Sequence, residues 1–390
     1  MTDPSVPSPP ADALAHSAAL QARIAERIRR AGGVIDFSEY MRAALYEPGL
    51  GYYSAGSAKF GAAGDFITAP ELSPLFGACI ADQLVPLLRD WPDAQVLELG
   101  PGSGALAIAV LRRLAARRAL PARYLLLETS ADLRARQQQA LTAALPGLAG
   151  RLHWLDAPPH APWRGVVLAN EVLDAQPVSR FMVTASGWQL LGTGLSDHGF
   201  IDRPMPAPPA WADHLARLAA ALPVPLPVGH HAEFDPALNA LLKTLAAPLE
   251  AGWLMFIDYG HPRAAYYHPS RHRGTLMCHY RHRAHEDPYL WPGLQDITAW
   301  VDFTALAEAG HAAGLELLGY TTQAGFLLGA GLETLAAEGA GDAVANYRQA
   351  QQLKRLLLPS EMGERFKVMV LGRQAPPPAA FERIERIEPL

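Results

Sequence analysis

Two patterns of apolar positions alternate along the middle of the chain. Short apolar runs occur at 95–99, 124–128, 152–155, 165–169 and 252–257, and stretches with helical periodicity separate several of them. A continuous apolar run is typical of a strand that is buried on both faces, and the intervening helices supply the crossovers of a parallel sheet. The pattern therefore predicts an α/β protein whose parallel sheet is covered by helices on both faces.

The segments before this core carry different signals. Leu20, Ile24 and Ile28 recur every four residues before Gly32, which predicts an amphipathic helix that ends at glycine. The stretch 49–77 is rich in Gly, Ala, Pro and aromatic residues and fits neither period, so a long ordered loop or lid is expected there.

Further elements are expected in the segments that follow the core strands. Ser186-Gly187 is a hairpin signal, and proline-rich stretches follow it. The segment 260–298 is irregular. Beyond it the periodicity predicts a helix at 303–313, a strand at 315–320, further helical stretches and a terminal strand at 366–371.

The composition narrows the class of protein. Half of the 390 residues are hydrophobic and 18% are charged, which excludes a disordered chain, and the net charge of −5 argues against a nucleic-acid binder. Two cysteines, Cys79 and Cys278, are too few for a disulfide framework or a four-thiolate zinc site. No apolar stretch approaches the roughly 20 residues that span a bilayer. The first residues lack the pattern of a signal or presequence, so a cytoplasmic protein without membrane insertion is expected.

A glycine-rich turn follows the first apolar run. Glu98 precedes Gly100, Pro101, Gly102 and Gly104, and a helical pattern begins directly afterwards. Glycine allows the backbone to lie against a ligand, and the N-terminus of a helix offers unpaired N–H groups to an anionic group. The turn therefore predicts the binding of a nucleotide-type cofactor.

Two further carboxylates refine the identity of that cofactor. Glu128 ends the second run, where it can accept both ribose hydroxyls, and Asp156 after the third run can bond an adenine amine. Glu98 favours the cationic S-adenosylmethionine, because a carboxylate would repel a pyrophosphate. A nicotinamide or flavin dinucleotide and a purely structural turn remain alternatives.

Asn170, Glu171 and Asp174 follow the fourth run and should emerge at the carboxyl edge of the sheet, beside the cofactor. One interpretation is that Asn170 caps a short helix whose first turn carries the two acids. The other is a carboxylate pair that grips a cationic nucleophile. Arginine suits such a pair, because its guanidinium becomes nucleophilic only when paired acids localise its charge on the other nitrogens. Methyl transfer of this kind requires no metal and no covalent intermediate, so we expect no metal site.

Several further fragments accompany these motifs, and together they carry a resemblance. They are Gly51–Tyr53, Gly64–Glu71, Phe76–Gly77, Asn170–Pro177, Asp258–Gly260, Gly274–Leu276, Asp296–Thr298, Thr322–Leu327 and Gly363–Lys367. Over nearly its whole length the chain resembles the MidA family of adenosylmethionine-dependent protein methyltransferases. Mitochondrial members of that family assemble respiratory complex I and dimethylate an arginine of its quinone-site subunit. The resemblance implies a class I methyltransferase sheet, which is Rossmann-like and mostly parallel with an antiparallel strand near the C-terminus. It also implies an N-terminal helical and lid extension and insertions.

Other residues are weaker candidates for substrate contacts. The resemblance suggests that Asp65 and Glu71 of the lid reach the active site, although both suit local caps. Tyr259 follows the fifth strand and could line the acceptor pocket. Tyr280 and His282 belong to a histidine- and arginine-rich segment at 261–285. We interpret that segment as a basic loop that positions a substrate peptide or is merely solvated, because its cationic neighbours disfavour a metal.

We therefore predict an enzyme that binds adenosylmethionine and methylates a protein arginine, with a homo-oligomer possible. A small-molecule methyltransferase and a non-catalytic assembly chaperone are the rival interpretations. The predicted organisation is a disordered leader (1–12), an N-terminal helix and lid (13–92), a cofactor-binding core (93–178), an insertion (179–250), the remainder of the core (251–373) with a substrate loop (260–300), and a tail (374–390).

Overall fold

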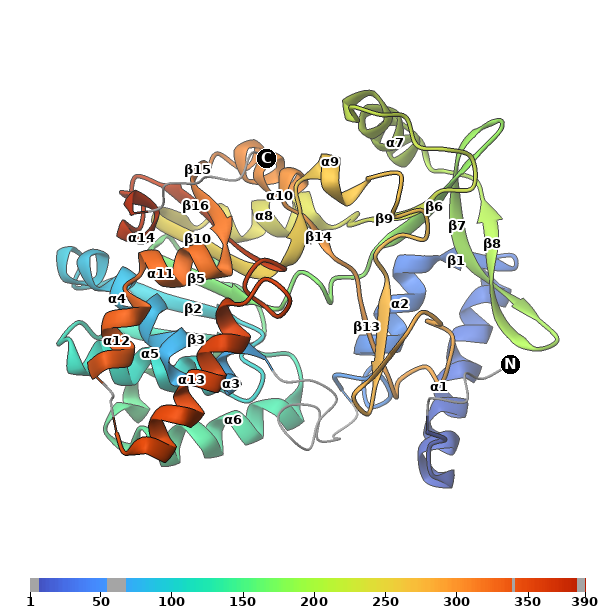
Figure 1. The fold of residues 1–390 in the computed structure, drawn as a ribbon. Coiled ribbons are helices and arrows are strands. Elements are labelled where there is room, and N and C mark those ends of the chain that lie inside the picture. Colours follow the sequence, from blue (N-terminus) through green and yellow to red (C-terminus); the bar gives the residue numbers. More distant parts are fainter. Residues whose placement is uncertain (1–6, 55–67, 339–340, 384–389) are drawn as a thin grey trace. The chain divides into compact units, whose positions relative to one another are not determined.

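The computed structural model describes residues 7–54, 68–338, 341–383 and 390. The chain divides into two compact units, each assembled from separate stretches of sequence (Figure 1). The described part of unit 1 consists of 7–54, Asp174–Leu238 and His261–Asp302. Unit 2 contains 68–173, Asn239–Gly260 and the described residues from Phe303 onward.

Unit 2 is built on a mixed sheet with the strand order β15-β16-β10-β5-β2-β3-β4. The pairs from β4 to β10 are parallel, and β16 runs antiparallel to both β10 and β15. This arrangement confirms the predicted α/β fold, including the antiparallel strand near the C-terminus. The strands are β2 (Gln95–Leu99), β3 (Arg123–Leu127), β4 (Leu152–Leu155), β5 (Trp163–Asn170), β10 (Leu249–His261), β15 (Glu316–Thr322) and β16 (Phe366–Arg373).

Helices cover both faces of this sheet, as the apolar runs predict. One core cluster joins Val96, Val166 and Val368 to the helices that precede and follow β2. On the other face, a Cβ on Gly310 of α10 would lie 2.5 Å from Leu371 Cδ1, so α10 packs directly on β16. The helices of unit 2 are α3 (Ala69–Leu72), α4 (Pro74–Asp90), α5 (Ala105–Ala116), α6 (Ala131–Ala144), the 3-10 helix η1 (Pro146–Arg151), α8 (Leu238–Ala246), α10 (Phe303–Ala312), α11 (Gln323–Gly329), α12 (Leu332–Glu338), α13 (Ala343–Leu357) and α14 (Ala379–Glu382).

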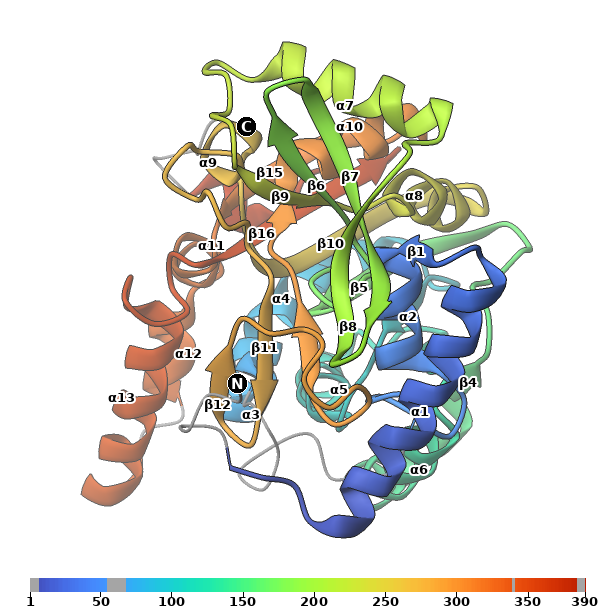
Figure 2. The same cartoon turned by 90° about the vertical axis from the view of Figure 1, so that its right-hand side faces the viewer.

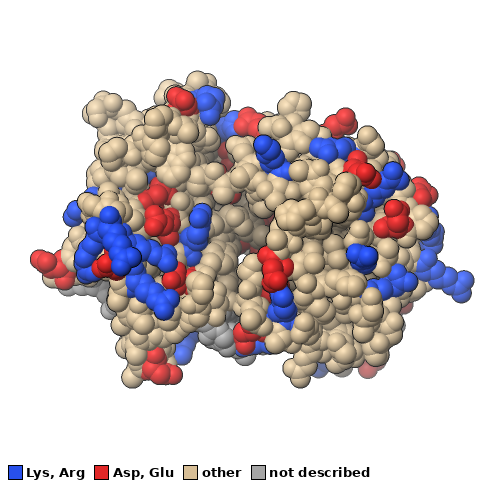
Figure 3. All heavy atoms as spheres, turned by 180° about the vertical axis from the view of Figure 1, so that it is seen from behind, with Lys and Arg blue, Asp and Glu red and all other residues tan. Residues whose placement is uncertain are grey.

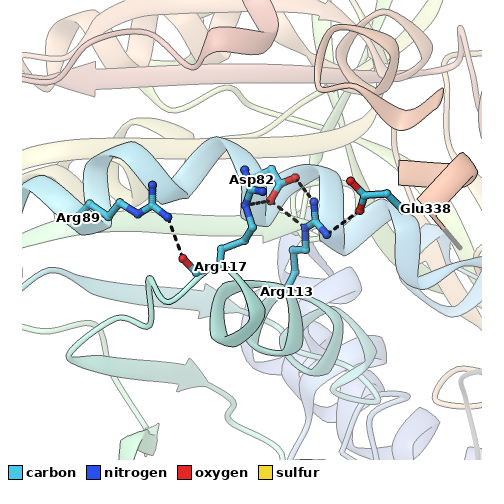
Figure 4. A network of polar contacts seen from close by, with 5 residues as sticks. All are labelled: Asp82, Arg89, Arg113, Arg117 and Glu338. Carbon is cyan, nitrogen blue, oxygen red and sulfur yellow. Dashed lines mark hydrogen bonds and ion pairs between the residues drawn. The ribbon is translucent and has the colours of Figure 1, made fainter. Parts of the chain in front are cut away.

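An ion-pair network joins three of these helices (Figure 4). Arg113 of α5 binds Asp82 of α4 through two hydrogen bonds of 2.9 and 2.7 Å and also reaches Glu338 of α12 at 3.1 Å. Arg117 lies 3.4 Å from Asp82, and Arg89 donates to the Arg117 carbonyl. Bidentate arginine–carboxylate pairs restrict geometry as well as adding energy. The network therefore fixes α5, and with it the turn that precedes α5, against α4.

The expectation of a loop over 49–77 is wrong for its second part. Ser73 accepts a hydrogen bond from the Leu75 N–H, and Pro74 occupies the first turn of α4. Helical periodicity is hidden there because α4 buries residues all around its axis, among them Phe76, Gly77 and Cys79. Residues 55–67, the middle part of the expected lid, lie outside the described residues.

Unit 1 contains a five-stranded antiparallel sheet in which β1-β7-β6-β9 are neighbours and β8 pairs with β7. The hairpin predicted at Ser186-Gly187 joins β6 to β7. Leu20, Ile24 and Ile28 of α1 are fully buried, as the periodicity predicts. The elements are α1 (Ala11–Arg30), β1 (Val34–Asp36), α2 (Phe37–Tyr46), β6 (Ser179–Thr184), β7 (Gly187–Ser196), β8 (Gly199–Met205), α7 (Pro209–Ala221) and β9 (His231–Phe234).

The segment expected to be irregular, 260–298, contains a second, three-stranded sheet of unit 1 (Figure 2). Its hairpin turns at Arg281 and His282, which both adopt positive φ angles, 47° and 60°. Short strands with charged tips lack a periodic signal, which is why the sequence did not reveal them. The elements of this segment are α9 (Arg263–Tyr266), β11 (Met277–Tyr280), β12 (Arg283–His285) and β13 (Asp296–Thr298), and the short strand β14 (Val301–Asp302) follows the segment.

Charges of both signs occupy the surface. Figure 3 shows one gathering of Lys and Arg on the face seen from behind, with Asp and Glu interspersed over the rest of that face. Within the described ranges, none of the helices combines the length and the apolarity that crossing a bilayer requires.

Candidate functional site

The glycine turn lies between β2 and α5 of unit 2. Gly100, Gly102 and Gly104 all adopt left-handed φ angles, 56°, 57° and 83°. A side chain is strained in that conformation, and a Cβ on Gly100 would also come within 3.2 Å of Val172 Cγ2. Gly104 is the N-cap of α5 and has no side chain to satisfy the first N–H groups of that helix. The turn thus forms a cradle of backbone groups that suits a nucleotide-type ligand.

Glu98 lies in β2 directly before this turn and is only 2% exposed. The Tyr124 hydroxyl donates a 2.6 Å hydrogen bond to its Oε2 atom. Burial raises the pKa of Glu98 to about 8, and the hydrogen bond from Tyr124 offsets only part of this rise. The carboxyl group therefore carries a proton near neutral pH, and a neighbouring cation would favour its ionised form.

Glu128 follows β3 and is held by two donors. The Ser130 N–H donates to Oε1 at 2.8 Å, and Gln137 Nε2 donates to Oε2 at 2.9 Å. Burial raises the pKa of Glu128, and these bonds oppose that rise. Gln137 also donates to the Gly102 carbonyl at 3.0 Å, so one buried side chain connects the glycine turn to Glu128. The sequence gives no signal for Gln137, which is one of three consecutive glutamines in α6.

Asp156, the expected adenine contact, has a side chain that is 86% exposed and ion-paired with Arg134. Arg134 also donates to the carbonyl oxygens of Glu128 and Leu155. The structure therefore places Asp156 near the carboxyl ends of β3 and β4, with Arg134 between it and Glu128.

The acidic turn begins where β5 ends at Asn170. Glu171 has a left-handed φ of 53°, which is uncommon for a residue with a side chain and which glycine would adopt more readily. Asn170 donates to Glu171 Oε1 at 3.2 Å, and no helix begins at this point. The interpretation of Asn170 as a helix cap is therefore wrong. Val172, the next residue, is the one that approaches Gly100, so this turn lies beside the glycine turn.

Asp258 holds the acidic turn in this conformation. It lies in β10, is 1% exposed, and its Oδ2 atom accepts the N–H groups of Val172 at 3.2 Å and Leu173 at 2.9 Å. The Glu171 N–H donates to the Ile257 carbonyl at 2.9 Å. Backbone conformations of this kind persist where several contacts determine them, and they are frequent in active sites. Sequence reasoning included Asp258 in a motif but gave it no role, although its place at the end of a parallel strand was a usable signal.

Asp174 is the first residue of the second stretch of unit 1, whereas Glu171 belongs to unit 2. The two carboxylates that we expected to act as a pair are thus contributed by different units. Asp174 is 6% exposed, and its carbonyl oxygen accepts a 2.9 Å hydrogen bond from the Ala299 N–H.

The expected substrate contacts are distributed over both units. In unit 2, Glu71 is in α3, its buried Oε2 lacks a hydrogen-bond partner among the described residues, and Tyr259 packs edge-on against Phe366. In unit 1, Tyr280 is buried against Trp291, and His282 is exposed at the tip of the β11–β12 hairpin. Asp65 lies outside the residues that the structure describes.

Comparison with known proteins identifies relatives over most of the chain. The sequence model of the Methyltransf_28 family, described as S-adenosyl-L-methionine-dependent methyltransferases, matches residues 79–321. The zebrafish (Danio rerio) protein arginine methyltransferase NDUFAF7, mitochondrial, is 30% identical over 86% of this chain and 83% of its own length. The human (Homo sapiens) protein of the same name is 27% identical over 87% of this chain and 80% of its own length.

Solved structures with the same fold give a second comparison. A COG1565 superfamily member from Burkholderia thailandensis, crystallised with S-adenosyl-homocysteine, matches with a TM-score of 0.91 and 46% identity, covering 98% of this chain and 99% of that chain. A native crystal structure of a COG1565 protein from the same organism matches with a TM-score of 0.90, 45% identity and the same coverage. S-adenosyl-homocysteine is the demethylated form of S-adenosylmethionine, which agrees with the glycine cradle described above.

Proposed function

Because the chain belongs to the Methyltransf_28 family of S-adenosyl-L-methionine-dependent methyltransferases, we propose that its methyl acceptor is an arginine side chain of a protein. The family and the bound product of its structural relative give S-adenosylmethionine as the cofactor. The names of the relatives that are protein arginine methyltransferases support arginine as the acceptor. The resemblance to the MidA family supports the quinone-site subunit of respiratory complex I as the protein that carries it.

The residues that would hold the cofactor fit its chemistry. The backbone of Gly100 to Gly104 and the N-terminus of α5 would contact its polar portion, Glu128 would accept its ribose hydroxyls, and Glu98 would face its positive charge. Bound there, the cofactor supplies an electrophilic methyl group to a nucleophile aligned with the breaking bond. We assign cofactor binding to this turn because it presents backbone groups without obstructing side chains.

One observation carries the proposed acceptor chemistry. Glu171 is held in a left-handed conformation by Asp258, and its turn contacts the glycine turn through Val172 and Gly100. A carboxylate fixed there can accept hydrogen bonds from a guanidinium and draw its positive charge toward two of its nitrogens. The third nitrogen then has the electron pair that in-line transfer requires.

The test is methyl transfer from radiolabelled S-adenosylmethionine to purified quinone-site subunit and to a lysate of cells that lack this protein. We expect label in protein, released as methylarginine on acid hydrolysis, and we expect Glu171→Gln to abolish it while retaining cofactor affinity in isothermal titration. Label in small molecules alone would favour a small-molecule methyltransferase. Cofactor binding without any transfer would favour the assembly chaperone.

A further inference from the structure

Gln137 occupies a position in α6 that suits an apolar side chain. The buried residues of this helix are Leu133, Gln137 and Leu141, which recur every four residues and form the stripe that faces the core. Gln137 is 0% exposed, whereas its neighbours Gln138 and Gln139 are exposed. A buried amide destabilises the fold unless its polar atoms are hydrogen-bonded, so a glutamine in this stripe requires partners.

The Gln137 amide has partners on three different segments of unit 2. Its Nε2 atom donates to the Gly102 carbonyl at 3.0 Å and to Glu128 Oε2 at 2.9 Å, and its Oε1 atom accepts from Trp154 Nε1 at 3.1 Å. A carbonyl and an ionised carboxylate can only accept, and an indole N–H can only donate. The three contacts therefore fix the orientation of the amide, and glutamine is the uncharged side chain of this length that can make all of them.

The Glu128 carboxylate is held by this amide on one side. Glu128 is 7% exposed, and each of its oxygens accepts a hydrogen bond, Oε1 from the Ser130 N–H at 2.8 Å and Oε2 from Gln137. Each oxygen retains capacity to accept a further donor. Burial raises the pKa of Glu128, and the bonds from Ser130 and Gln137 lower it. Gln137 thus favours the ionised form, which accepts hydroxyl groups.

The same amide holds the glycine turn. Gly102 has a left-handed φ of 57°, and a Cβ on Gly104 would lie 3.0 Å from Leu141 Cδ1, one helical turn beyond Gln137. The helix α6 therefore packs directly against the turn. Because one side chain binds both the Gly102 carbonyl and Glu128, a change at Gln137 alters both parts of the cofactor site together.

We propose that Gln137 is a positioning residue that holds Glu128 and the glycine turn in one arrangement, and that it thereby makes the site selective for a cofactor with an intact ribose diol. This inference rests on the assignment of Glu128 to the ribose hydroxyls in the proposed function, and it is independent of the methyl acceptor. A ribose presents two neighbouring hydroxyls, and each can donate to one oxygen of a carboxylate whose plane is fixed. A carboxylate that rotates freely accepts the pair less well.

The test is isothermal titration with S-adenosyl-homocysteine and with its 2′-deoxyribose analogue, so that selectivity is the ratio of the two Kd values. We expect the wild-type chain to bind the ribose form about tenfold more tightly or better, since the analogue loses a hydrogen bond to a charged group. Gln137→Met keeps the length of the side chain but removes its donors and its acceptor, and it should reduce the ratio to about threefold or less. Gln137→Glu should do the same, because it sets a second carboxylate against Glu128.

Gln138→Met is the matched control, because Gln138 is an exposed glutamine of the same helix. Its Kd values and their ratio should equal those of the wild-type chain. Melting temperatures of the ligand-free chains establish that each variant is folded, and Gln137→Glu, which keeps the shape of the side chain, decides the question if Gln137→Met does not fold. In a double-mutant cycle, adding Gln137→Met to Glu128→Gln should lower the ratio no further, because Gln137 acts through Glu128.

The outcomes separate the inference from the assignment on which it rests. If the wild-type chain binds both ligands equally, the assignment of Glu128 to the ribose fails, and the inference fails with it. If Glu128→Gln lowers the ratio while the Gln137 variants weaken both ligands equally, Gln137 is a merely structural contact and the inference alone is wrong.

Discussion

Replacing Glu98 by glutamine should change how stability depends on pH. The wild-type carboxyl group has a pKa of about 8 when folded because it is buried, against an ordinary pKa of 4.5. Between these two values the unfolded chain loses its proton while the folded chain keeps it, so the folded state becomes less stable as pH rises. Below pH 4.5 both states are protonated and the penalty is absent. Glutamine cannot ionise, yet its amide oxygen can still accept the hydrogen bond from Tyr124.

The magnitude follows from the two pKa values. The full difference corresponds to about 5 kcal/mol at 1.36 kcal/mol for each pKa unit, reached only above pH 8. Over the experimentally convenient interval from pH 5.5 to 7.5, the same two values give a change of about 2.5 kcal/mol. The free energy of unfolding of Glu98→Gln should therefore rise relative to that of the wild-type chain by about this amount across the interval.

The assay is urea unfolding of the cofactor-free protein, followed by tryptophan fluorescence at both pH values for both chains. Every other titrating group contributes equally to the two curves, so the difference between them isolates Glu98. Glu26→Gln is the control, because Glu26 is an exposed surface carboxylate. The free energy of unfolding of Glu26→Gln should differ from that of the wild-type chain by the same amount at both pH values. Parallel curves for Glu98→Gln and the wild-type chain would show that Glu98 ionises normally when buried, and would refute the reasoning.

Three further predictions concern the two turns. Glu171→Gly should preserve stability or raise it by up to about 1 kcal/mol in thermal unfolding, since glycine accepts the left-handed φ. The same change should abolish methyl transfer, and retained transfer would remove Glu171 from the acceptor site. Asp258→Asn should lower kcat about tenfold or more and leave the Kd of S-adenosylmethionine within about twofold, because it loosens the acidic turn alone. An equal loss of kcat and of cofactor affinity would show that Asp258 supports the whole sheet edge. Gly102→Val should abolish cofactor binding in isothermal titration, since a branched side chain is strained at a φ of 57°; unchanged binding would move the cofactor away from this turn.

The fold of unit 2 was predictable because its signals are local and repeated. Each parallel strand is an apolar run, and a glycine or a capping residue marks the start of the helices that follow β2 and β3, at Gly104 and Ser130. Unit 1 was less predictable. Its strands pair segments far apart in sequence, as Ile35 pairs with Thr193, and nothing in a local pattern specifies such partners. The helix α4 was missed for a different reason, since burial all around its axis erases the periodicity that marks a surface helix.

The residues of the candidate site show the same difference between local signals and contacts of segments far apart in sequence. Motif spacing indicated Glu98, the glycines and Glu171 as candidates, because strand ends and turns position these residues through the backbone alone. It could not locate the side chains that orient them. Gln137 reaches both Gly102 and Glu128 from a helix, and Asp258 reaches the acidic turn from a neighbouring strand. Such contacts depend on register and packing between elements, so a chain that kept every glycine and acid but lost these supports would retain the motif and lose the geometry that the chemistry needs.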